Sequence, residues 1–335
     1  MRRIVTVTLN PAIDRTVWVD ALVPGTTVRT ADTRASFGGK GINVARGVAR
    51  IGAPVTALGL AGEDQATSIE RHLQSLGVAA NFIRIPGETR TNLKIIEQVN
   101  GRLTEINGSG AQVSSEQIKA LEHELLSEVG REEVGVVVFA GSLPMGVDAS
   151  VYARWTEILR VEQPNLRVLV DASDEALERV ARARPFFLKP NRVEAAALTG
   201  RRIETDADAT EAATQILALG VQGVLLSLGS AGAVAGWGNE VERLPASPIA
   251  VPPGHLQTTV GAGDAMVARV AVELAKLDGA EVERGDFYAM CRLAVAEAEA
   301  QIGGVLTSPV AATSSGYPGV VPAENERGAV PMADA

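Results

Sequence analysis

The residues best suited to chemistry lie in one small-residue segment, TTVGAGDA at 258–265. Glycines let the backbone approach a ligand closely, and the free amides at the start of a helix favour an anion. Gly261, Ala262 and Gly263 are therefore predicted to form a phosphate cradle. A phosphate would repel Asp264 there, so we expect this carboxylate to face the attacking nucleophile and accept its proton. An ordinary carboxylate in the first turn of a helix is the alternative explanation.

Other phosphate and metal motifs fail on their spacing. The segment GGKG at 38–41 lacks the earlier glycine and the following Ser or Thr of a Walker A loop. No strand-like run leads into a properly spaced G-x-G-x-x-G, which argues against a dinucleotide-binding fold. His123 and Glu124 begin a zincin-like pattern, but Ser127 stands where the second histidine is required.

Composition limits the class of protein and its partners. The chain has 335 residues, 46% hydrophobic and 4% aromatic, which suits helices layered on a sheet. Lys and Arg number 31 against 40 Asp and Glu, a net charge of −9, so neither nucleic acid nor an anionic membrane is expected as a partner. Cys291 is the only cysteine, which excludes an internal disulfide and fits a reducing compartment. The short run at 4–9 indicates a strand rather than a signal peptide, so we expect a cytoplasmic protein without a membrane span.

Apolar periodicity predicts the scaffold that positions these residues. Strand-like runs alternate with helical patterns, which predicts βαβ units in an α/β fold with a mostly parallel central sheet flanked by helices. The expected strands of this sheet are 4–9, 135–140, 167–171, 186–189 and 223–228. The expected helices are 41–52, 64–76, 150–162, 174–183, 192–199, 206–219, 263–275 and 287–301.

Two further parts of the chain differ from this pattern. Half-polar runs predict a small separate sheet, with strands at 14–19, 28–34, 91–97 and 103–106. Beyond about residue 307 the chain is rich in Pro, Gly, Ser and Ala without periodicity, which predicts a disordered tail at 309–335. We expect 1–308 to form a single domain.

Five motifs, in order, resemble those of the PfkB or ribokinase family of carbohydrate kinases over roughly residues 3–306. They are GGKGINVA at 38–45, GSLP at 141–144, KPNRVE at 189–194, SLGSAGA at 227–233 and TVGAGD at 259–264. The resemblance implies a ribokinase-like fold and transfer of the γ-phosphate of ATP to a sugar hydroxyl, with Asp264 as base and 261–263 as anion hole. It also implies that the small sheet is a lid that closes over the sugar, and that two lids pack together in a homodimer.

The resemblance further implies a nucleotide and metal site. Asn191 and Glu194, the family's N-x-x-E pair, would organise Mg²⁺ and the ATP phosphates through water. The same pair could cap a helix, and both roles can hold at once. The residues expected along the ATP phosphates and ribose are Lys189, Ser227, Gly229 and Gly232.

The sugar site is expected just past the first strand, where an open parallel sheet places its ligand crevice. The resemblance assigns sugar hydroxyls to Asp14, which could otherwise be an ordinary turn residue. The other substrate-binding residues expected there are Arg29, Gly38, Gly39, Lys40, Asn43, Arg90, Asn92 and Ser142. Several of these are cations, and a neutral sugar gives no reason to gather them, so a phosphorylated sugar is favoured. Lys94 could join them or be a solvated strand residue.

Four segments look most like the 1-phosphofructokinase branch of the family, and next most like tagatose-6-phosphate kinases. They are NPAID at 10–14, GKG at 39–41, TRTNLK at 89–94 and EINGSG at 105–110. The resemblance implies conversion of fructose 1-phosphate to fructose 1,6-bisphosphate, with tagatose 6-phosphate or fructose 6-phosphate as alternative substrates. Ala140, Met145 and Ala265 depart from the family pattern, and Met145 leaves the sugar-phosphate preference open.

Two functions of other classes remain as alternatives. A non-catalytic sugar-phosphate sensor would keep the fold, but retention of Asp264, Asn191 and Glu194 argues against it. A nucleoside kinase would need aromatic side chains for base stacking, which are scarce in this chain.

Overall fold

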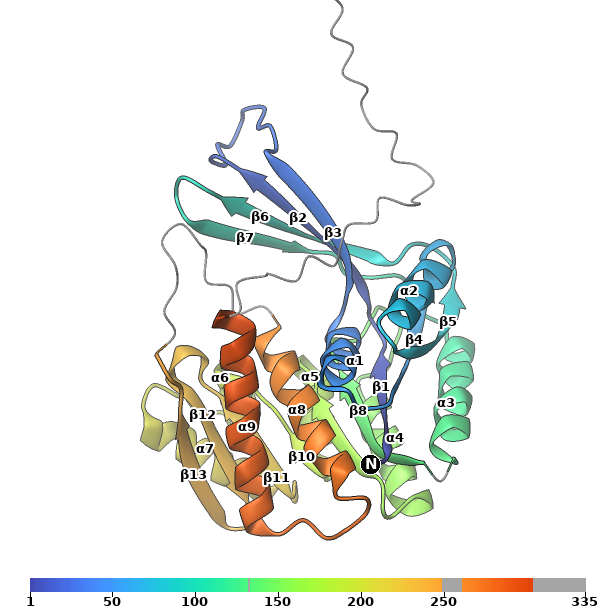
Figure 1. The fold of residues 1–335 in the computed structure, drawn as a ribbon, viewed down its shortest axis with the longest axis vertical. Coiled ribbons are helices and arrows are strands. Elements are labelled where there is room, and N and C mark those ends of the chain that lie inside the picture. The colour runs from blue at the N-terminus through green and yellow to red at the C-terminus, as the bar shows by residue number, and fades with distance from the viewer. Residues whose placement is uncertain (132, 249–260, 304–335) are drawn as a thin grey trace, which may run out of the picture.

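The computed structural model describes residues 1–131, 133–248 and 261–303, which form a layered α/β structure (Figure 1). The strands are β1 (Arg3–Thr8), β2 (Ala12–Val19), β3 (Asp32–Gly38), β4 (Val55–Gly62), β5 (Ala79–Ile85), β6 (Arg90–Glu97), β7 (Arg102–Asn107), β8 (Val134–Ala140), β9 (Arg167–Asp171), β10 (Phe187–Leu188), β11 (Gly223–Ser227), β12 (Gly232–Trp237) and β13 (Glu240–Pro245). The helices are α1 (Lys40–Ile51), α2 (Glu63–Ser75), α3 (Ser115–Val129), α4 (Val151–Glu162), α5 (Asp174–Arg182), α6 (Arg192–Thr199), α7 (Asp206–Ala218), α8 (Ala262–Lys276) and α9 (Arg284–Gly303), with a short 3₁₀ turn at Gly229–Ala231.

The large sheet has the strand order β13-β12-β11-β10-β9-β8-β1-β4-β5. From β5 to β11 all neighbouring strands are parallel, and only β12 and β13 at one edge run antiparallel. The expected mostly parallel α/β fold is therefore confirmed. β1 starts at the end of the body away from the small sheet and runs toward it (Figure 1), so the carboxyl ends of the parallel strands face the small sheet.

Several elements were missing from the sequence prediction. β4 reads VTALGLAG, and its glycines and small residues give a weak strand signal, although all of it is buried between two neighbouring strands. β5, β12 and β13 were missed as well, and so was α3. The start of α3 did carry a local signal, because Ser114 and Gln117 form a capping box there.

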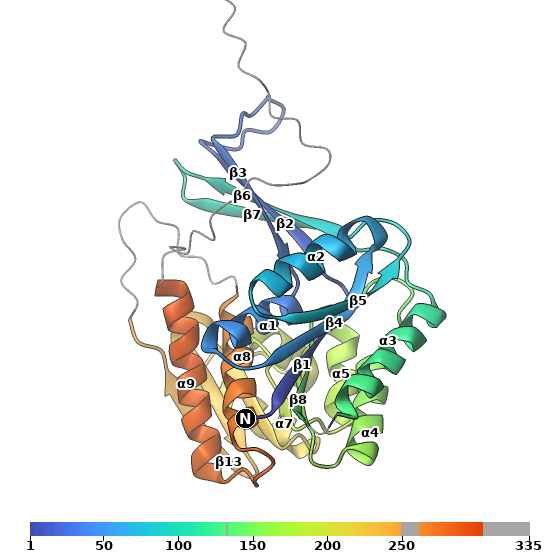
Figure 2. The same ribbon diagram turned by 45° about the vertical axis from the view of Figure 1, so that its right-hand side comes forward.

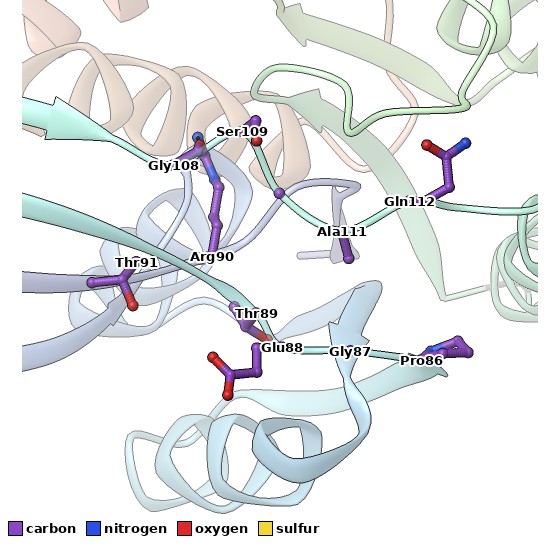
Figure 3. Close-up of a pocket in the computed structure, with 11 residues that line it drawn as sticks. Pro86, Gly87, Glu88, Thr89, Arg90, Thr91, Gly108, Ser109, Ala111 and Gln112 are labelled. Atoms are coloured by element: carbon purple, nitrogen blue, oxygen red, sulfur yellow. Dashed lines mark hydrogen bonds between the residues drawn. The ribbon is translucent and has the colours of Figure 1, made fainter.

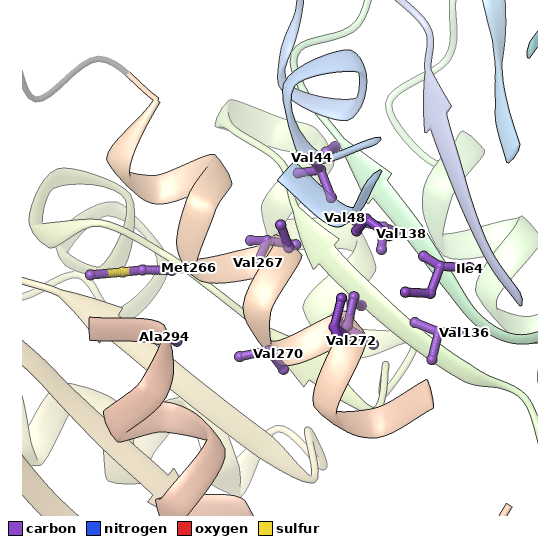
Figure 4. Packing of buried hydrophobic residues seen from close by; sticks show 14 of the residues in the cluster. Ile4, Val44, Val48, Val136, Val138, Met266, Val267, Val270, Val272 and Ala294 are labelled. Atoms are coloured by element: carbon purple, nitrogen blue, oxygen red, sulfur yellow. The ribbon is translucent and has the colours of Figure 1, made fainter. Parts of the chain in front are cut away.

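Helices cover both faces of the large sheet (Figures 1 and 2). Successive side chains of a strand point to opposite faces, so Ile4 and Val5 of β1 belong to different core clusters. The Ile4 face packs against α1, α2, α8 and α9, as the valines around Val267 and Val270 show (Figure 4). The Val5 face packs against α3, α4, α5 and α7, where Tyr152 stacks on Phe139. Burial of this sheet fixes the position of every strand end.

The small sheet has the order β3-β2-β6-β7 and projects from the carboxyl edge of the large sheet (Figures 1 and 2). We call these four strands the lid. Its strands agree with three of the four predicted segments. The strand expected at 28–34 lies instead at Asp32–Gly38, because pairing with β2 runs from Ala12 opposite Gly38 to Trp18 opposite Asp32.

The predicted tail at 309–335 lies outside the described residues. Across 1–131, 133–248 and 261–303, the structure contains no helix long and apolar enough to span a bilayer. Cys291 is buried in α9.

Candidate active site

The predicted phosphate cradle forms the start of α8. Gly261 caps the helix in a left-handed conformation with φ of 82°, and Ala262 and Gly263 open the first turn. A Cβ added to Gly263 would lie 3.2 Å from the Nζ atom of Lys189. The helix start and a cation therefore meet at one point, as an anion site requires. The preceding residues 258–260 lie outside the described part of the chain.

Asp264 is buried in the first turn of α8, with 8% of its surface exposed. The side-chain amide of Asn43 donates a hydrogen bond of 2.8 Å to Asp264 Oδ2. Asn43 lies in α1, which packs beside α8 against the same face of the sheet (Figure 4). The structure thus brings together a residue predicted for the sugar and the residue predicted as base.

A buried cluster of charges lies next to Asp264. Asp171, 1% exposed at the end of β9, accepts a hydrogen bond of 2.9 Å from Lys40 Nζ. Lys189 Nζ lies 3.4 Å from the same oxygen, Asp171 Oδ1. Lys40 also lies 3.7 Å from Glu194 Oε1. Two ammonium groups are therefore held at the carboxyl edge of the sheet, where a phosphate would need them.

Asp171 was not among the predicted site residues. A signal existed, because Asp171 ends a predicted strand, and parallel strands present ligand residues at their carboxyl ends. Its partners could not be predicted, since Lys40 is 131 positions away in the chain. Lys40 itself was expected at the sugar, and the structure places its ammonium group between Asp171 and Glu194.

These surroundings shift the pKa of Asp264 toward neutrality. Burial raises the pKa of Asp264 to about 6, and the carboxylate of Asp171 adds to the increase. The hydrogen bond from Asn43 and the charges of Lys40 and Lys189 lower the pKa by a smaller amount. Burial opposes the charge on Asp171, but Lys189 and Lys40 outweigh it, and the pKa of Asp171 is lowered. A carboxylate with a pKa near neutrality is suited to general-base catalysis.

Asn191 and Glu194 form a helix cap. Asn191 Oδ1 accepts a hydrogen bond of 2.9 Å from the backbone amide of Glu194. Glu194 Oε2 accepts one of 2.8 Å from the backbone amide of Asn191. This capping box starts α6 and confirms the structural alternative. The second carboxylate oxygen, Glu194 Oε1, faces Lys40, so the metal role of the pair stays a prediction.

The segment predicted for ATP lies beside this cap. The Ser227 amide donates a hydrogen bond of 2.9 Å to the carbonyl of Pro190, and Ser227 forms a bridge with Asn191. Gly229 has φ of 66°, and a Cβ added to it would meet no other atom within 4 Å. Gly232 has φ of 97°, and an added Cβ would lie 2.2 Å from the carbonyl oxygen of Leu244. Gly232 is thus required by packing, whereas Gly229 leaves room for a ligand.

Most residues predicted for the sugar meet at the base of the lid. Asn92 donates a hydrogen bond of 2.9 Å to Asp14 Oδ1, and Lys94 Nζ lies 3.6 Å from Asp14 Oδ2. A Cβ on Gly38 would lie 2.2 Å from Asp14 Oδ2, so glycine allows this carboxylate to cross the strand. Gly39 follows as the N-cap of α1 with φ of 113°. Lys94 is paired with Asp14 and is not a solvated strand residue.

Arg90 borders a cavity of about 500 Å³ at the junction of lid and body (Figure 3). The cavity is lined by the segments 86–91 and 108–112. The Arg90 side chain reaches from β6 to Gly108, whose carbonyl it binds at 3.0 Å (Figure 3). The cavity does not extend to Asp264, which is absent from its lining.

Ser142 lies beside the segment that follows β1, whereas Arg29 is exposed on the segment between β2 and β3. Asn10, two residues past the end of β1, donates from its side-chain amide to Ser142 Oγ at 3.3 Å. Arg29 is exposed between β2 and β3, beside the end of β2 marked by Trp18. Trp18 is four positions along β2 from Asp14, which corresponds to about 13 Å. The segment 28–31 lies outside the paired strands, and the sugar-binding role of Arg29 stays a prediction.

Comparisons with known proteins agree on one class. Residues 5–311 match the sequence profile described as pfkB family carbohydrate kinase. The 1-phosphofructokinase of Rhodobacter capsulatus is 38% identical over 79% of this chain and 82% of that protein. The 1-phosphofructokinase of Escherichia coli K12 is 33% identical over 90% of this chain and 93% of that protein. The tetrameric inhibited form of phosphofructokinase-2 from Escherichia coli superposes with a TM-score of 0.80 at 29% identity, covering 90% of this chain and 94% of the other.

Proposed function

Because the chain belongs to the pfkB family of carbohydrate kinases, we propose that it transfers the γ-phosphate of ATP to fructose 1-phosphate, giving fructose 1,6-bisphosphate and ADP. It is a phosphotransferase that acts on a sugar hydroxyl, with ATP as the donor. The observation that carries the mechanism is the buried carboxylate of Asp264 beside a glycine-lined helix start and two ammonium groups. The names of several relatives support the choice of sugar.

Asp264 is the proposed base. As the sugar oxygen bonds to the γ-phosphorus, the bond to the ADP oxygen breaks and the hydroxyl proton moves to the carboxylate. Asn43 holds the carboxylate through its 2.8 Å hydrogen bond. The amides of 261–263 and the ammonium group of Lys189 neutralise charge that develops on the phosphate. Lys189, Ser227, Gly229 and Gly232 are proposed to line the nucleotide.

The residues present fit a Mg²⁺ ion held partly by the nucleotide. In the described ranges, no three His, Cys, Asp or Glu side chains gather into a cage of protein ligands. Mg²⁺ commonly uses one or two carboxylates, water and substrate phosphates. Glu194 and Asn191 would hold it through water, and the buried Asp171 Oδ2 nearby has no hydrogen-bond partner among the described residues. When bound, the ion would neutralise phosphate charge and orient the γ-phosphate.

The phosphate already on the sugar is assigned to the base of the lid. Arg90 and Lys94 supply positive charge there, beside Asp14, which would bind sugar hydroxyls. The cavity at 86–91 and 108–112 provides space next to Arg90. Gly38, Gly39, Asn92 and Ser142 are proposed to complete this part of the site. The lid would close over the sugar and keep water from the γ-phosphate.

A coupled ADP-release assay tests the reaction. Fructose 1-phosphate should be turned over with the highest kcat/KM among fructose 1-phosphate, fructose 6-phosphate, tagatose 6-phosphate, unphosphorylated sugars and nucleosides. A preference for fructose 6-phosphate or tagatose 6-phosphate would correct the substrate and keep the chemistry. No ADP release with any acceptor would favour the sensor.

Asp264→Asn tests the base. The amide cannot accept the proton, so kcat should fall about a hundredfold or more, while the affinity for the sugar changes little. Asp286→Asn is the matched control, because Asp286 is an exposed carboxylate in the first turn of α9. Near-normal turnover in Asp264→Asn would remove Asp264 from the role.

We also propose that the protein forms a homodimer through its lid and works in the cytoplasm. One lid face carries apolar side chains, among them Ile106, which is 57% exposed. Light scattering at micromolar concentration should give twice the mass of one chain. The single cysteine, Cys291, is buried and fits a reducing compartment, and activity in the cytosolic fraction of its cells tests the location.

A further inference from the structure

The loop at 227–232 is braced by a side chain that the proposed reaction does not use. Arg243 lies on β13, opposite Val234 of β12. Its Nη1 atom donates to the carbonyl of Ala233 at 3.1 Å, and its Nη2 atom donates to the carbonyl of Ala231. These two acceptors flank Gly232, so one guanidinium group holds the chain on both sides of that glycine.

The loop requires such a brace because of its glycines. Gly229 and Gly232 both have positive φ, 66° and 97°. Glycine loses more conformational freedom on folding than any other residue, so a loop with two of them is poorly fixed by its own backbone. The 2.8 Å hydrogen bond from the Leu228 amide to the Gly232 carbonyl closes the turn. Arg243 attaches that closed turn to the sheet.

Arg243 has two further anchors. Its Nη1 atom also donates to the carbonyl of Leu244 at 2.8 Å, the next residue of β13, which fixes the guanidinium group against its own strand. Its Nε atom lies 3.1 Å from Asp206 Oδ1, at the first residue of α7. A planar guanidinium with several fixed donors is suited to join three segments in this way.

The braced loop borders the nucleotide site. Ser227 binds the carbonyl of Pro190 at 2.9 Å, next to Asn191. Gly229 and Ser230 are exposed at the tip of the loop, so they remain available to a ligand. Among the described residues, the side chain of Arg243 binds three carbonyls and pairs with Asp206, so its contacts lie outside the proposed catalytic residues.

We infer that Arg243 is a positioning residue for ATP, because it holds the loop 227–232 in the conformation that receives the nucleotide. The inference rests on the proposed assignment of this loop to ATP. It predicts that loss of Arg243 weakens the use of ATP and leaves the use of the sugar unchanged, since the sugar residues lie on α1 and the lid.

Steady-state kinetics of Arg243→Met and Arg243→Lys test the inference. In Arg243→Met, KM for ATP should rise about tenfold, which corresponds to about 1.4 kcal/mol, while KM for fructose 1-phosphate stays within about twofold. In Arg243→Lys, KM for ATP should lie between the values of the unaltered protein and Arg243→Met, because an ammonium group keeps the charge and loses the fork of donors. Arg292→Met is the matched control. Arg292 lies on α9 and pairs at 2.6 Å with Glu242, the neighbour of Arg243 on β13, so its loss removes an ion pair to the same strand without touching the loop. Both KM values should stay unchanged in the control.

Three outcomes overturn the inference. One is a KM for ATP in Arg243→Met within about twofold of the unaltered protein. Another is an equal rise in both KM values, which would show a general loss of structure. If Arg243→Met does not fold, Arg243→Lys carries the test alone. Lysine cannot reach both the Ala231 and Ala233 carbonyls with a fixed fork of donors, so an unchanged KM for ATP in Arg243→Lys is the third contrary outcome.

Failure of the proposed function has a different signature. In that case the unaltered protein releases no ADP with any sugar phosphate. Calorimetric titration with ADP then still compares the unaltered protein with Arg243→Met. A loss of ADP affinity of about tenfold would keep Arg243 in its role, and equal affinities would remove it.

Discussion

The protonation state of Asp264 should control turnover near neutral pH. Burial and the neighbouring Asp171 raise the pKa of Asp264 to about 6. Only the ionised carboxylate can accept the sugar proton, so activity is lost as pH falls through that value. We expect kcat/KM to level off above about pH 7 and to fall about tenfold per unit well below pH 6. A pH profile measured with fructose 1-phosphate checks this, and an acid limb near pH 4 would contradict the burial of the base.

A substitution at Asp171 tests what raises the pKa of Asp264. Asp171→Asn removes a negative charge that raises the pKa of Asp264, so the acid limb should move to lower pH. The same change loosens Lys40 and Lys189, so kcat should also fall. Asp286→Asn, far from this cluster, should leave the profile unchanged. A limb that stays in place in Asp171→Asn would show that burial alone sets the pKa.

The packing of helix α1 on strand β1 positions two residues of the site, Lys40 and Asn43. A Cβ at Gly41 would lie 2.3 Å from Thr8 Oγ1 and 2.9 Å from the carbonyl oxygen of Val7. Gly41→Ala should therefore lower the free energy of unfolding by about 1–3 kcal/mol. It should also lower kcat/KM, because α1 carries Lys40 and Asn43.

Urea denaturation measures this cost against a matched glycine. Gly285 lies in the first turn of α9 with nothing within 4 Å of an added Cβ. Gly285→Ala should leave stability unchanged or raise it by up to about 1 kcal/mol, since alanine suits a helix better. Equal stability of the two variants would show that α1 shifts freely on β1, contrary to the packing described.

The lid is the surface through which we expect two chains to form the homodimer. Side chains two positions apart on a strand share a face. The apolar side chains on the face opposite Asp14 include Ile13, Val17, Leu93, Ile95 and Ile106. Ile106→Glu places a charge on this face, so the homodimer should dissociate to single chains in light scattering. Val161→Glu, at an exposed apolar position of α4 outside the lid, should leave the dimer intact. A dimer that survives Ile106→Glu would place the interface elsewhere.

The features of the fold and the site that the sequence predicted correctly come from short-range patterns. The βαβ alternation, the glycine-lined start of α8 and the cap formed by Asn191 and Glu194 each depend on neighbours within a few positions. The strands β4 and β12 escaped because small residues and glycines carry little periodicity, and β13 escaped as a short edge strand with three charged residues, EVERLP. The register of β3 also escaped, since pairing with β2 sets it.

The sequence by itself determined the fold class, the family resemblance and the identity of the candidate base, because these follow from short-range patterns and motif order. Only the tertiary structure decided that Asp171 holds Lys40 and Lys189, that Asn43 holds Asp264 and that Arg243 braces a loop. The physical reason is the same in each case. These contacts join residues on separate elements, and strand order and helix packing alone bring such residues together.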